Sequence, residues 1–387
     1  MSQNLFENWD VTKGALTDGL TGNKKAVMEA TLENTKAYLA ETASAGTTMS
    51  GNVATLNKVI LPVIRRVMPT VIANELVGVQ PMTGPVGQIH TLRVRYSATA
   101  AGVTAGDEAL SPFAIANGYS GNATSGKADS TSTLEAEAGR ALSIQVLKQT
   151  VEAKTRKLSA RWTFEAAQDA QSMHGLDVEA EIMQALAQEI TAEIDQEILT
   201  SLDTLAGTAT DTYNQGGVSG TPTFVGDQHA ALAVLINRSA NLIASRTRRG
   251  AGNWVVVSPT ILTVLQSATT SAFARTTEGP FEAPTNTKFV GTLNGTMRVF
   301  VNQYAADSAN IIVGYKGDGE IDAAAFYCPY IPLMSSGTVL DPSTFEPVVS
   351  FMTRYGYVEL SNQASSLGNA ADYLSKIAVT SGQLAFT

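Results

Sequence analysis

The chain of 387 residues contains a single cysteine, Cys328, so no disulfide can form within it. The lack of disulfides is typical of proteins that are made and used in a reducing compartment. No apolar run approaches the roughly 20 residues that a membrane-spanning helix requires. The segment Met1–Asp10 has no basic stretch followed by an apolar one, so no secretory signal is expected. We therefore expect synthesis and use in a cytoplasm, without insertion into a membrane.

Charged residues are also scarce. They make up 16% of the chain, against about 25% in an ordinary soluble domain. Extensive burial between subunits would explain this, because charged residues are depleted in interface cores. An ordinary soluble protein rich in alanine and threonine fits the composition equally well. The net charge of −9 argues against a surface built to wrap nucleic acid, which would be basic.

Recognisable catalytic and metal-binding motifs are missing too. The patterns GxSxG, HExxH and CxxC do not occur. His90, His174 and His229 lie far apart without partners at ligand spacing, which favours surface or interface histidines. The run Gly314–Gly319 lacks the spacing of a phosphate-binding loop and is better explained as a turn whose glycines supply positive φ. We expect no catalytic residue, no cofactor and no metal, which argues mildly for a structural protein and against an enzyme.

Apolar periodicity predicts an α+β chain with one long helix. Between Leu176 and Leu202, apolar residues recur at every fourth position. Since an α-helix has 3.6 residues per turn, this stripe drifts by about 40° per step, and the two ends must bury against different surroundings. Ser361–Thr387 reads as a mostly polar tail. Further helices are predicted at 23–43, 228–245 and 260–267, the last one capped by Ser258, and strands at 253–257, 297–302, 310–315, 323–328 and 347–360.

An extended hairpin is predicted before the long helix. A strand over Gln88–Tyr96 and a returning strand over Thr133–Ala153 flank a stretch, Ser97–Thr131, that has almost nothing to bury. Such a stretch is expected to be mobile unless a neighbour orders it. An isolated two-stranded hairpin is marginally stable in water. The hairpin is therefore expected to lie across an adjacent subunit.

Two idiosyncratic segments carry a family resemblance. The first is Ala325–Met334 (AFYCPYIPLM), with Asp341–Val348 (DPSTFEPV) and Phe351–Gly356 (FMTRYG) after it. The second joins Arg65–Pro69 (RRVMP) to Ile72–Ile89 (IANELVGVQPMTGPVGQI). Prolines at such offsets suit strand edges and corners rather than a catalytic loop. In this order the segments resemble the major capsid proteins of T-even-like tailed bacteriophages, and in outline the resemblance covers nearly the whole chain.

This resemblance implies the Hong Kong 97-like phage capsid fold. That α+β fold has an N-terminal arm, an extended β-hairpin loop, a long spine helix in a peripheral domain, and an axial domain. The implied segments are 1–75 (arm), 76–165 (start of the peripheral domain and extended loop), 166–220 (spine helix), 221–340 (axial domain) and 341–387 (return to the peripheral domain and C-terminal tail). In the relatives a maturation protease often removes a leader. Here the leader would lie within 1–41, with Glu41-Thr42 as the candidate cleavage point.

The implied function is that of a structural shell protein. By resemblance, copies form hexamers, and pentamers if the chain also supplies the vertices. These close into an icosahedral head around double-stranded DNA, without sequence-specific binding. The implied partners are a scaffold, a maturation protease, a portal and decoration or cement proteins, and the head assembles in the host cytoplasm. The alternatives are a vertex paralogue, an encapsulin-type shell protein, and an α+β enzyme whose site is built from distant residues. A secreted adhesin is disfavoured by the missing signal peptide.

Charged rows supply the candidates for contacts between subunits. Glu189, Glu193 and Glu197 share one face of the long helix, where no histidine would complete a di-iron site. Most such rows are simply solvated, but a sharper hypothesis is that they meet cations on a neighbour. A solvated turn is the simplest interpretation of the basic cluster 246–249, ahead of a neighbour's acidic patch and of packaged DNA. The candidate cations are Lys154, Arg156, Lys157 and Arg161, or Arg246, Arg248 and Arg249.

Overall fold

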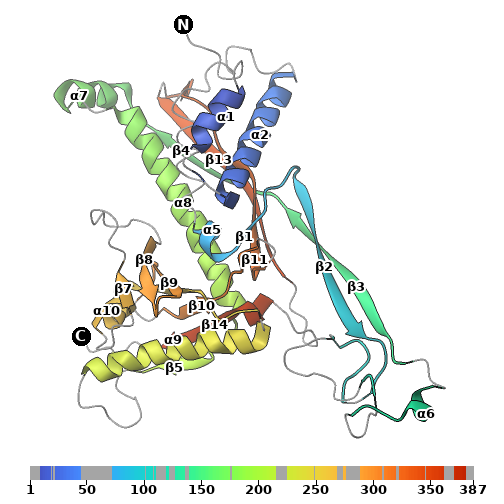
Figure 1. The fold of residues 1–387 in the computed structure, drawn as a ribbon. Coiled ribbons are helices and arrows are strands. Elements are labelled where there is room, and N and C mark those ends of the chain that lie inside the picture. Colours follow the sequence, from blue (N-terminus) through green and yellow to red (C-terminus); the bar gives the residue numbers. More distant parts are fainter. Residues whose placement is uncertain are drawn as a thin grey trace. The chain divides into compact units, whose positions relative to one another are not determined.

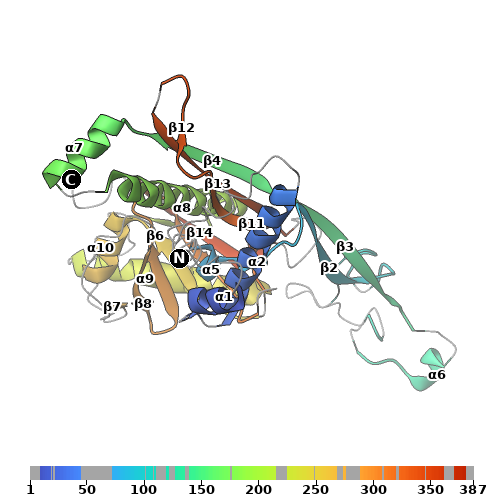
Figure 2. The same ribbon diagram turned by 90° about the horizontal axis from the view of Figure 1, so that it is seen from above.

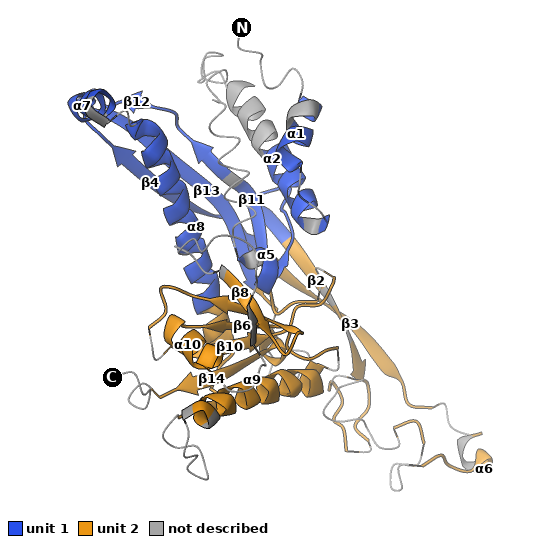
Figure 3. Cartoon of the chain, turned by 60° about the vertical axis from the view of Figure 1, so that its left-hand side comes forward, with its two compact units in different colours: residues 1–87, 151–200, 326–358 blue, residues 88–150, 201–325, 359–387 orange. Residues whose placement is uncertain are grey.

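A computed structural model shows that the chain is α+β, as predicted, and that it divides into two compact units (Figure 3). Unit 1 comprises Met1–Gly87, Val151–Thr200 and Phe326–Val358, and unit 2 comprises the segments between and after them. The five consecutive segments predicted from the sequence stay a prediction. The structure describes residues 9–18, 20, 22–44, 72–100, 102–107, 109, 119–121, 127–135, 139–174, 177–214, 225–247, 249–267, 273–275, 288–306, 309–319, 322–344, 346–360 and 370–380.

Unit 1 is built on a five-stranded sheet. Strand β11 (Ala325–Ser335) pairs with β13 (Pro347–Glu359) and, in parallel, with β1 (Gly78–Val79). Strand β13 also pairs antiparallel with β12 (Val339–Leu340) and, along its other edge, with β4 (Lys154–Arg161). Burial alternates along most of β13, as expected for a strand with one core-facing side. The strands predicted at 323–328 and 347–360 are thereby confirmed.

Helix α8 (Val178–Leu205) confirms the long helix predicted from the fourfold apolar spacing. Figures 1 and 2 both show its unit 1 part alongside β4 and β13. Its apolar stripe, which includes Ile190, Ile194 and Ile198, is buried. Helix α7 (Phe164–His174) precedes it and is largely exposed.

Two N-terminal helices also belong to unit 1. Helix α2 (Gly22–Ser44) confirms the helix predicted at 23–43, and α1 (Trp9–Thr17) contacts it through Lys13, which forms an ion pair with Glu33 at 3.2 Å. The Asn34 amide of α2 donates hydrogen bonds to the backbone carbonyls of Met82 (2.8 Å) and Tyr330 (3.1 Å), so α2 is fixed to the sheet. The predicted arm between 45 and 71 lies outside the described residues.

Unit 2 contains a seven-stranded sheet covered by α9 (Val225–Thr247) and α10 (Pro259–Ser267). Both helices were predicted, and Ser258 Oγ accepts the N–H of Ile261 (3.4 Å), which confirms the capping role of Ser258. The sheet order is β5 (Asp211–Tyr213), β14 (Leu374–Val379), β10 (Ile311–Gly314), β6 (Trp254–Val257), β9 (Met297–Val301), β8 (Lys288–Leu293) and β7 (Phe273–Arg275).

The predicted polar tail is wrong for part of its length. Strand β14 lies between β10 and β5, and Leu374 and Ile377 are fully buried. The short turn η2 (Ala370–Tyr373) precedes it. Polar neighbours in sequence conceal this short strand, because its partners are distant in the chain.

The glycines after β10 also differ from the prediction. Positive φ does not occur at Gly314, Gly317 or Gly319. Space is the reason for the first two: a Cβ on Gly314 would lie 2.0 Å from the Trp254 ring, and one on Gly317 would lie 2.6 Å from the Asp322 carboxylate. These positions therefore need glycine for close packing rather than for backbone conformation.

The predicted hairpin is present as the ribbon formed by β2 (Val86–Tyr96) and β3 (Leu142–Glu152) (Figure 1). The returning strand starts at Leu142 rather than at Thr133, and α6 (Thr131–Leu134) occupies part of the intervening stretch. That stretch was expected to bury almost nothing. Instead Tyr119 packs against Tyr96, with ring centroids 4.6 Å apart, in a small buried cluster. Val103 and Ala109 are buried with the two rings, so these four side chains form a local core.

Candidate inter-subunit surfaces

One candidate cation, Arg156, lies at the centre of a polar cluster in unit 1. Its Nε donates a hydrogen bond to the hydroxyl of Tyr355 on β13 (2.5 Å). Its terminal nitrogens donate to Glu193 (2.7 Å) and to Glu197 on α8. The Tyr355 hydroxyl donates to Glu197 as well. The cluster therefore ties the sheet to the long helix within one chain.

The electrostatics of this cluster favour full charge on both partners. Burial opposes the charge on Arg156, but hydrogen bonds with Glu197 and Tyr355 outweigh burial and raise the pKa of Arg156. Burial likewise opposes ionisation of Glu197, yet the bonds from Arg156 and Tyr355 lower the pKa of Glu197 below its ordinary value. The guanidinium and the carboxylate are thus charged near neutral pH.

The row of glutamates is therefore divided. Arg156 of the same chain holds Glu193 and Glu197, whereas Glu189 is exposed and has no ion pair among the described residues. The hypothesis that this row meets a neighbour's cations stays a prediction, and Glu189 is its most available member. On β4, Lys154 and Lys157 are exposed, so these lysines can also contact a neighbouring subunit.

The other candidate cations have different surroundings. Arg161 lies 3.9 Å from Glu346, at the limit of an ion pair. Arg249 forms an ion pair with Asp322 at 2.5 Å, and the Tyr373 hydroxyl donates to the same carboxylate oxygen (3.1 Å). Arg246 is half-buried near the end of α9. Arg248 lies outside the described residues, as do the side chains of Glu41 and Thr42 in α2.

The histidines only partly match their interpretation as surface or interface residues. His90 is exposed on β2, and the side chain of His174 lies outside the described residues. His229 is buried between α9 and α10, where it shares a hydrogen bond with Ser267, so that interpretation is wrong for it. Burial lowers the pKa of His229 and keeps its ring neutral. The described residues contain no group of three or more acidic, His or Cys side chains that could hold a metal ion.

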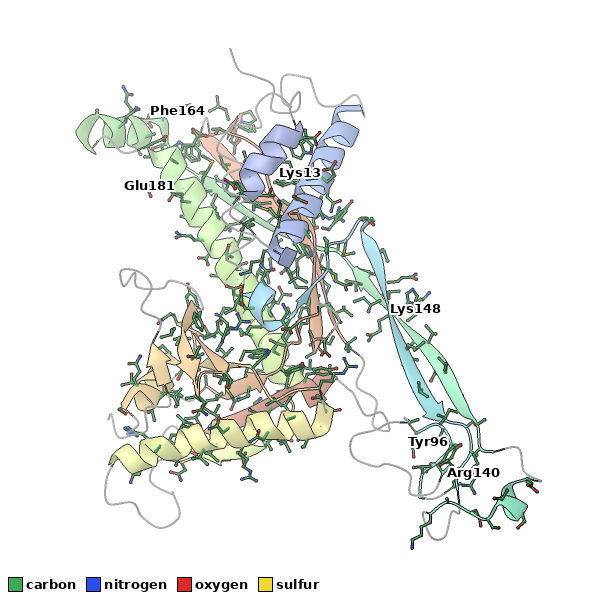
Figure 4. All side chains as sticks on the ribbon, in the orientation of Figure 1. Lys13, Tyr96, Arg140, Lys148, Phe164 and Glu181 are labelled. Atoms are coloured by element: carbon green, nitrogen blue, oxygen red, sulfur yellow. The ribbon has the colours of Figure 1, made fainter. Side chains whose placement is uncertain are left out.

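Charges of opposite sign are segregated along the chain, a signal that the sequence interpretation missed. No lysine or arginine occurs between Arg161 and Arg238, a segment that contains α7 and α8. Figure 4 marks Phe164 and Glu181 on these helices and Lys148 on the ribbon. The exposed acidic residues of α7 and α8 are Glu165, Asp169, Glu181, Glu189 and Glu193, and the exposed basic residues of β3 and β4 are Lys148, Lys154, Lys157 and Arg161.

The ribbon also exposes apolar side chains. Leu142, Ile144 and Val146 of β3 are 52%, 67% and 61% exposed, and Leu92 of β2 is 66% exposed. Positions two apart point to the same face of a strand, so the three β3 residues form one stripe. Contiguous exposed apolar side chains mark interaction surfaces. We call Leu92, Leu142, Ile144 and Val146 the ribbon stripe.

Comparison with known proteins identifies the family. The family model described as "Major capsid protein Gp23" matches two overlapping segments, residues 53–138 and 107–379. The chain belongs to this family. A relative from Enterobacteria phage T6, named "Major capsid protein", is 30% identical over 85% of this chain and 82% of its own length. Those from Enterobacteria phage T4 and Vibrio phage KVP40 carry the same name and are each 29% identical, over 85% and 83% of this chain and 80% of their own lengths.

Solved structures are similar at lower identity. "The capsid of Myoviridae Phage XM1" has a TM-score of 0.44 and 11% identity, over 79% of this chain and 89% of that one. "Capsid structure of the Cyanophage P-SCSP1u" has a TM-score of 0.46 and 13% identity, over 80% and 88% of the two chains.

Family membership shows that the chain is a major capsid protein, a subunit of the shell of a tailed-phage head. It also supports the Hong Kong 97-like assignment, whose long helix, extended ribbon and two sheet-containing parts the structure contains. The relatives are named for this structural role. Among the described helices, none is long and apolar enough to span a membrane.

Proposed function

We propose that copies of this capsid protein assemble as hexamers, with pentamers at the vertices, and that the ribbon of one copy lies across the next. The observation that carries this proposal is the ribbon stripe. Its four side chains are each more than half exposed, on a ribbon of only two strands. Burying such residues in a contact contributes about 1.5–3 kcal/mol for each fully covered side chain. A neighbouring copy is the partner that a shell always supplies.

Charge supports the same arrangement. The exposed charges of β4 are basic, β3 exposes Lys148 together with Glu152, and the exposed charges of α7 and α8 are all acidic. Lys148 and Lys157 of one copy would meet exposed carboxylates such as Glu189 of another. Complementary charge steers association and fixes orientation more than it adds affinity. The ion pairs would therefore select the register in which the ribbon docks, while the ribbon stripe supplies most of the binding energy.

The closed shell would enclose double-stranded DNA without binding its sequence. A net charge of −9 keeps the DNA from adhering to the wall. In the basic cluster, Arg249 is already neutralised by Asp322. The proposed partners are a scaffold, a maturation protease, a portal and cement proteins. Cleavage at Glu41-Thr42 would remove a leader that contains α1 and most of α2.

The test uses one charge placed on either face of β3. Ile144→Lys puts a lysine in the ribbon stripe, and Gln145→Lys puts the same charge on the neighbouring position, which is also exposed. Both variants should fold, because neither residue is buried. Negative-stain electron microscopy and sedimentation should show rings, tubes or shells for wild type and Gln145→Lys, and small species for Ile144→Lys.

The outcomes separate the alternatives. Normal assembly of Ile144→Lys would overturn the role of the ribbon stripe. Pentamers without hexamers would assign the chain to a vertex paralogue. Small uniform oligomers of the wild type, persisting with scaffold and protease present, would refute the shell function and favour an enzyme whose site is built from distant residues.

A further inference from the structure

A buried acid on the long helix is not explained by packing or assembly. Asp195 of α8 is 1% exposed. Its Oδ1 accepts a hydrogen bond from the backbone N–H of Ile72 (2.9 Å). Its Oδ2 is buried and has no hydrogen-bond partner among the described residues, and no described cation pairs with this carboxyl. A buried polar atom without a partner is costly and calls for a reason.

Ile72 is the first residue of the described segment 72–100. Its carbonyl accepts the N–H groups of Glu75 (2.9 Å) and Leu76 (3.2 Å), which starts the short helix α5 (Ala73–Leu76). Its side chain is buried. The Asp195 carboxyl is thus a side-chain attachment between the long helix and the start of this segment.

Among the described residues, no cation compensates a negative carboxylate at Asp195. Burial above all, and also the nearby charge of Asp195, raise the pKa of Tyr327 on β11, so its hydroxyl stays neutral. Burial also raises the pKa of the neighbouring Cys328 thiol to about 11. The nearby carboxylates already have partners: Glu75 of α5 pairs with Lys24 (2.6 Å), and Glu197 pairs with Arg156. Burial raises the pKa of Asp195 to about 7, although the bond from Ile72 opposes this rise.

We propose that Asp195 is a proton-dependent clasp, which holds the chain at Ile72 against α8 when protonated and loosens when ionised. A protonated carboxyl keeps its carbonyl oxygen for the Ile72 N–H without burying a charge. Opening the clasp admits water, which stabilises the ionised form. This inference concerns the subunit alone and does not rest on the proposed mode of assembly.

The sign of the pH dependence follows from the two states. The closed state titrates at about pH 7, and the open state has the ordinary value of 3.8. A group whose pKa is raised in the closed state stabilises that state fully below the open-state pKa. The attachment is therefore strongest in acid, weakens by about tenfold per pH unit between roughly pH 4 and pH 7, and is constant above that range.

Hydrogen exchange of the full-length chain, followed by mass spectrometry on peptides that contain Ile72, tests the clasp. After correction for intrinsic exchange, wild-type protection at Ile72 should fall about 100-fold from about pH 5 to about pH 7 and then stay level. Asp195→Asn keeps a carbonyl acceptor but cannot ionise, so its protection should not change with pH. Glu181→Gln removes an exposed carboxylate of the same helix that lies outside the row Glu189, Glu193 and Glu197, and it should retain the wild-type profile.

The wild-type profile alone decides the question if Asp195→Asn does not fold. Wild-type protection that is independent of pH over this range would overturn the proposal. It would also be overturned if Asp195→Asn kept the wild-type slope, because another group would then be titrating. A purely structural role would lower protection in the variant equally at every pH.

Discussion

The close approach of Gly314 and Trp254 gives the sharpest test of the packing in unit 2. These residues are register partners on the adjacent strands β10 and β6, and Trp254 is buried. A Cβ on Gly314 would lie 2.0 Å from Cζ2, 2.4 Å from Cε2 and 2.6 Å from Cη2 of the indole. Carbon atoms approach favourably only to about 3.5–4.0 Å. The substitution Gly314→Ala therefore forces the indole or a strand to move.

The size of the expected destabilisation depends on how little the surrounding structure can move. Overpacking a core costs typically about 1–3 kcal/mol. Strand β10 is paired on both sides, with β14 and β6, so its backbone cannot shift alone. We expect Gly314→Ala to lower the free energy of unfolding by about 3 kcal/mol, at the upper end of that range. Equilibrium urea unfolding of dissociated subunits, followed by far-ultraviolet circular dichroism, measures it.

Two further variants make the reasoning refutable. Gly139→Ala is the matched control, because nothing lies within 4 Å of a Cβ there, and it should change stability little. Trp254→Leu removes the clashing ring, so the double variant Gly314→Ala/Trp254→Leu should be more stable than the two single effects predict. Additive single effects, or equal stability of Gly314→Ala and Gly139→Ala, would show that the clash does not set the cost.

Three more predictions follow from single contacts. Arg156→Met should lower the free energy of unfolding by only about 1–2 kcal/mol, because Arg156 and Glu197 are partly exposed and solvent screens their interaction. The pKa of Glu197 is lowered in the folded state, so urea unfolding should show the full loss above about pH 4.5 and a smaller loss as the pH falls. Asn34→Ala leaves two backbone carbonyls without their donor, so exchange-protected amides of α2 should exchange about 5–30-fold faster, for a loss of about 1–2 kcal/mol, and an unchanged rate would contradict this docking. Raising sodium chloride from about 0.05 M to about 0.5 M should weaken wild-type assembly in sedimentation, and less so for Glu189→Gln, whereas assembly that ignores salt would contradict the proposed ion pairs.

Elements with strong local patterns were predicted from the sequence. Helix α8 follows from its fourfold apolar spacing, and α10 follows from the Ser258 cap and Pro259 at the first turn. Strand β13 was also predicted, and its burial alternates with period two. The idiosyncratic proline-containing segments led to the correct family. All of these signals lie within neighbouring residues, which is why one sequence suffices to find them.

The features that the sequence analysis missed depend on contacts between residues that are not neighbours in the chain. Strand β14 is short and surrounded by polar residues, and its partners β10 and β5 lie far away in the chain. The cluster of Tyr96 and Tyr119 joins residues on either side of a stretch rich in glycine and alanine. Pairing across such separations depends on the closure of the whole unit, and local periodicity does not encode it.

The sequence by itself determined the longer helices α2, α8 and α9 together with α10, about half of the strands, the extended hairpin and the capsid family, because periodicity and long motifs are local properties. Only the tertiary structure decided which charges meet. In the structure, Arg156 forms ion pairs with Glu193 and Glu197 of the same chain, and Glu189 is exposed. Asp195 is buried and accepts a hydrogen bond from the backbone N–H of Ile72. These four carboxylates all lie within nine consecutive residues of helix α8, and nothing in the sequence distinguishes them. Their roles diverge because burial and partners come from the strands packed against that helix.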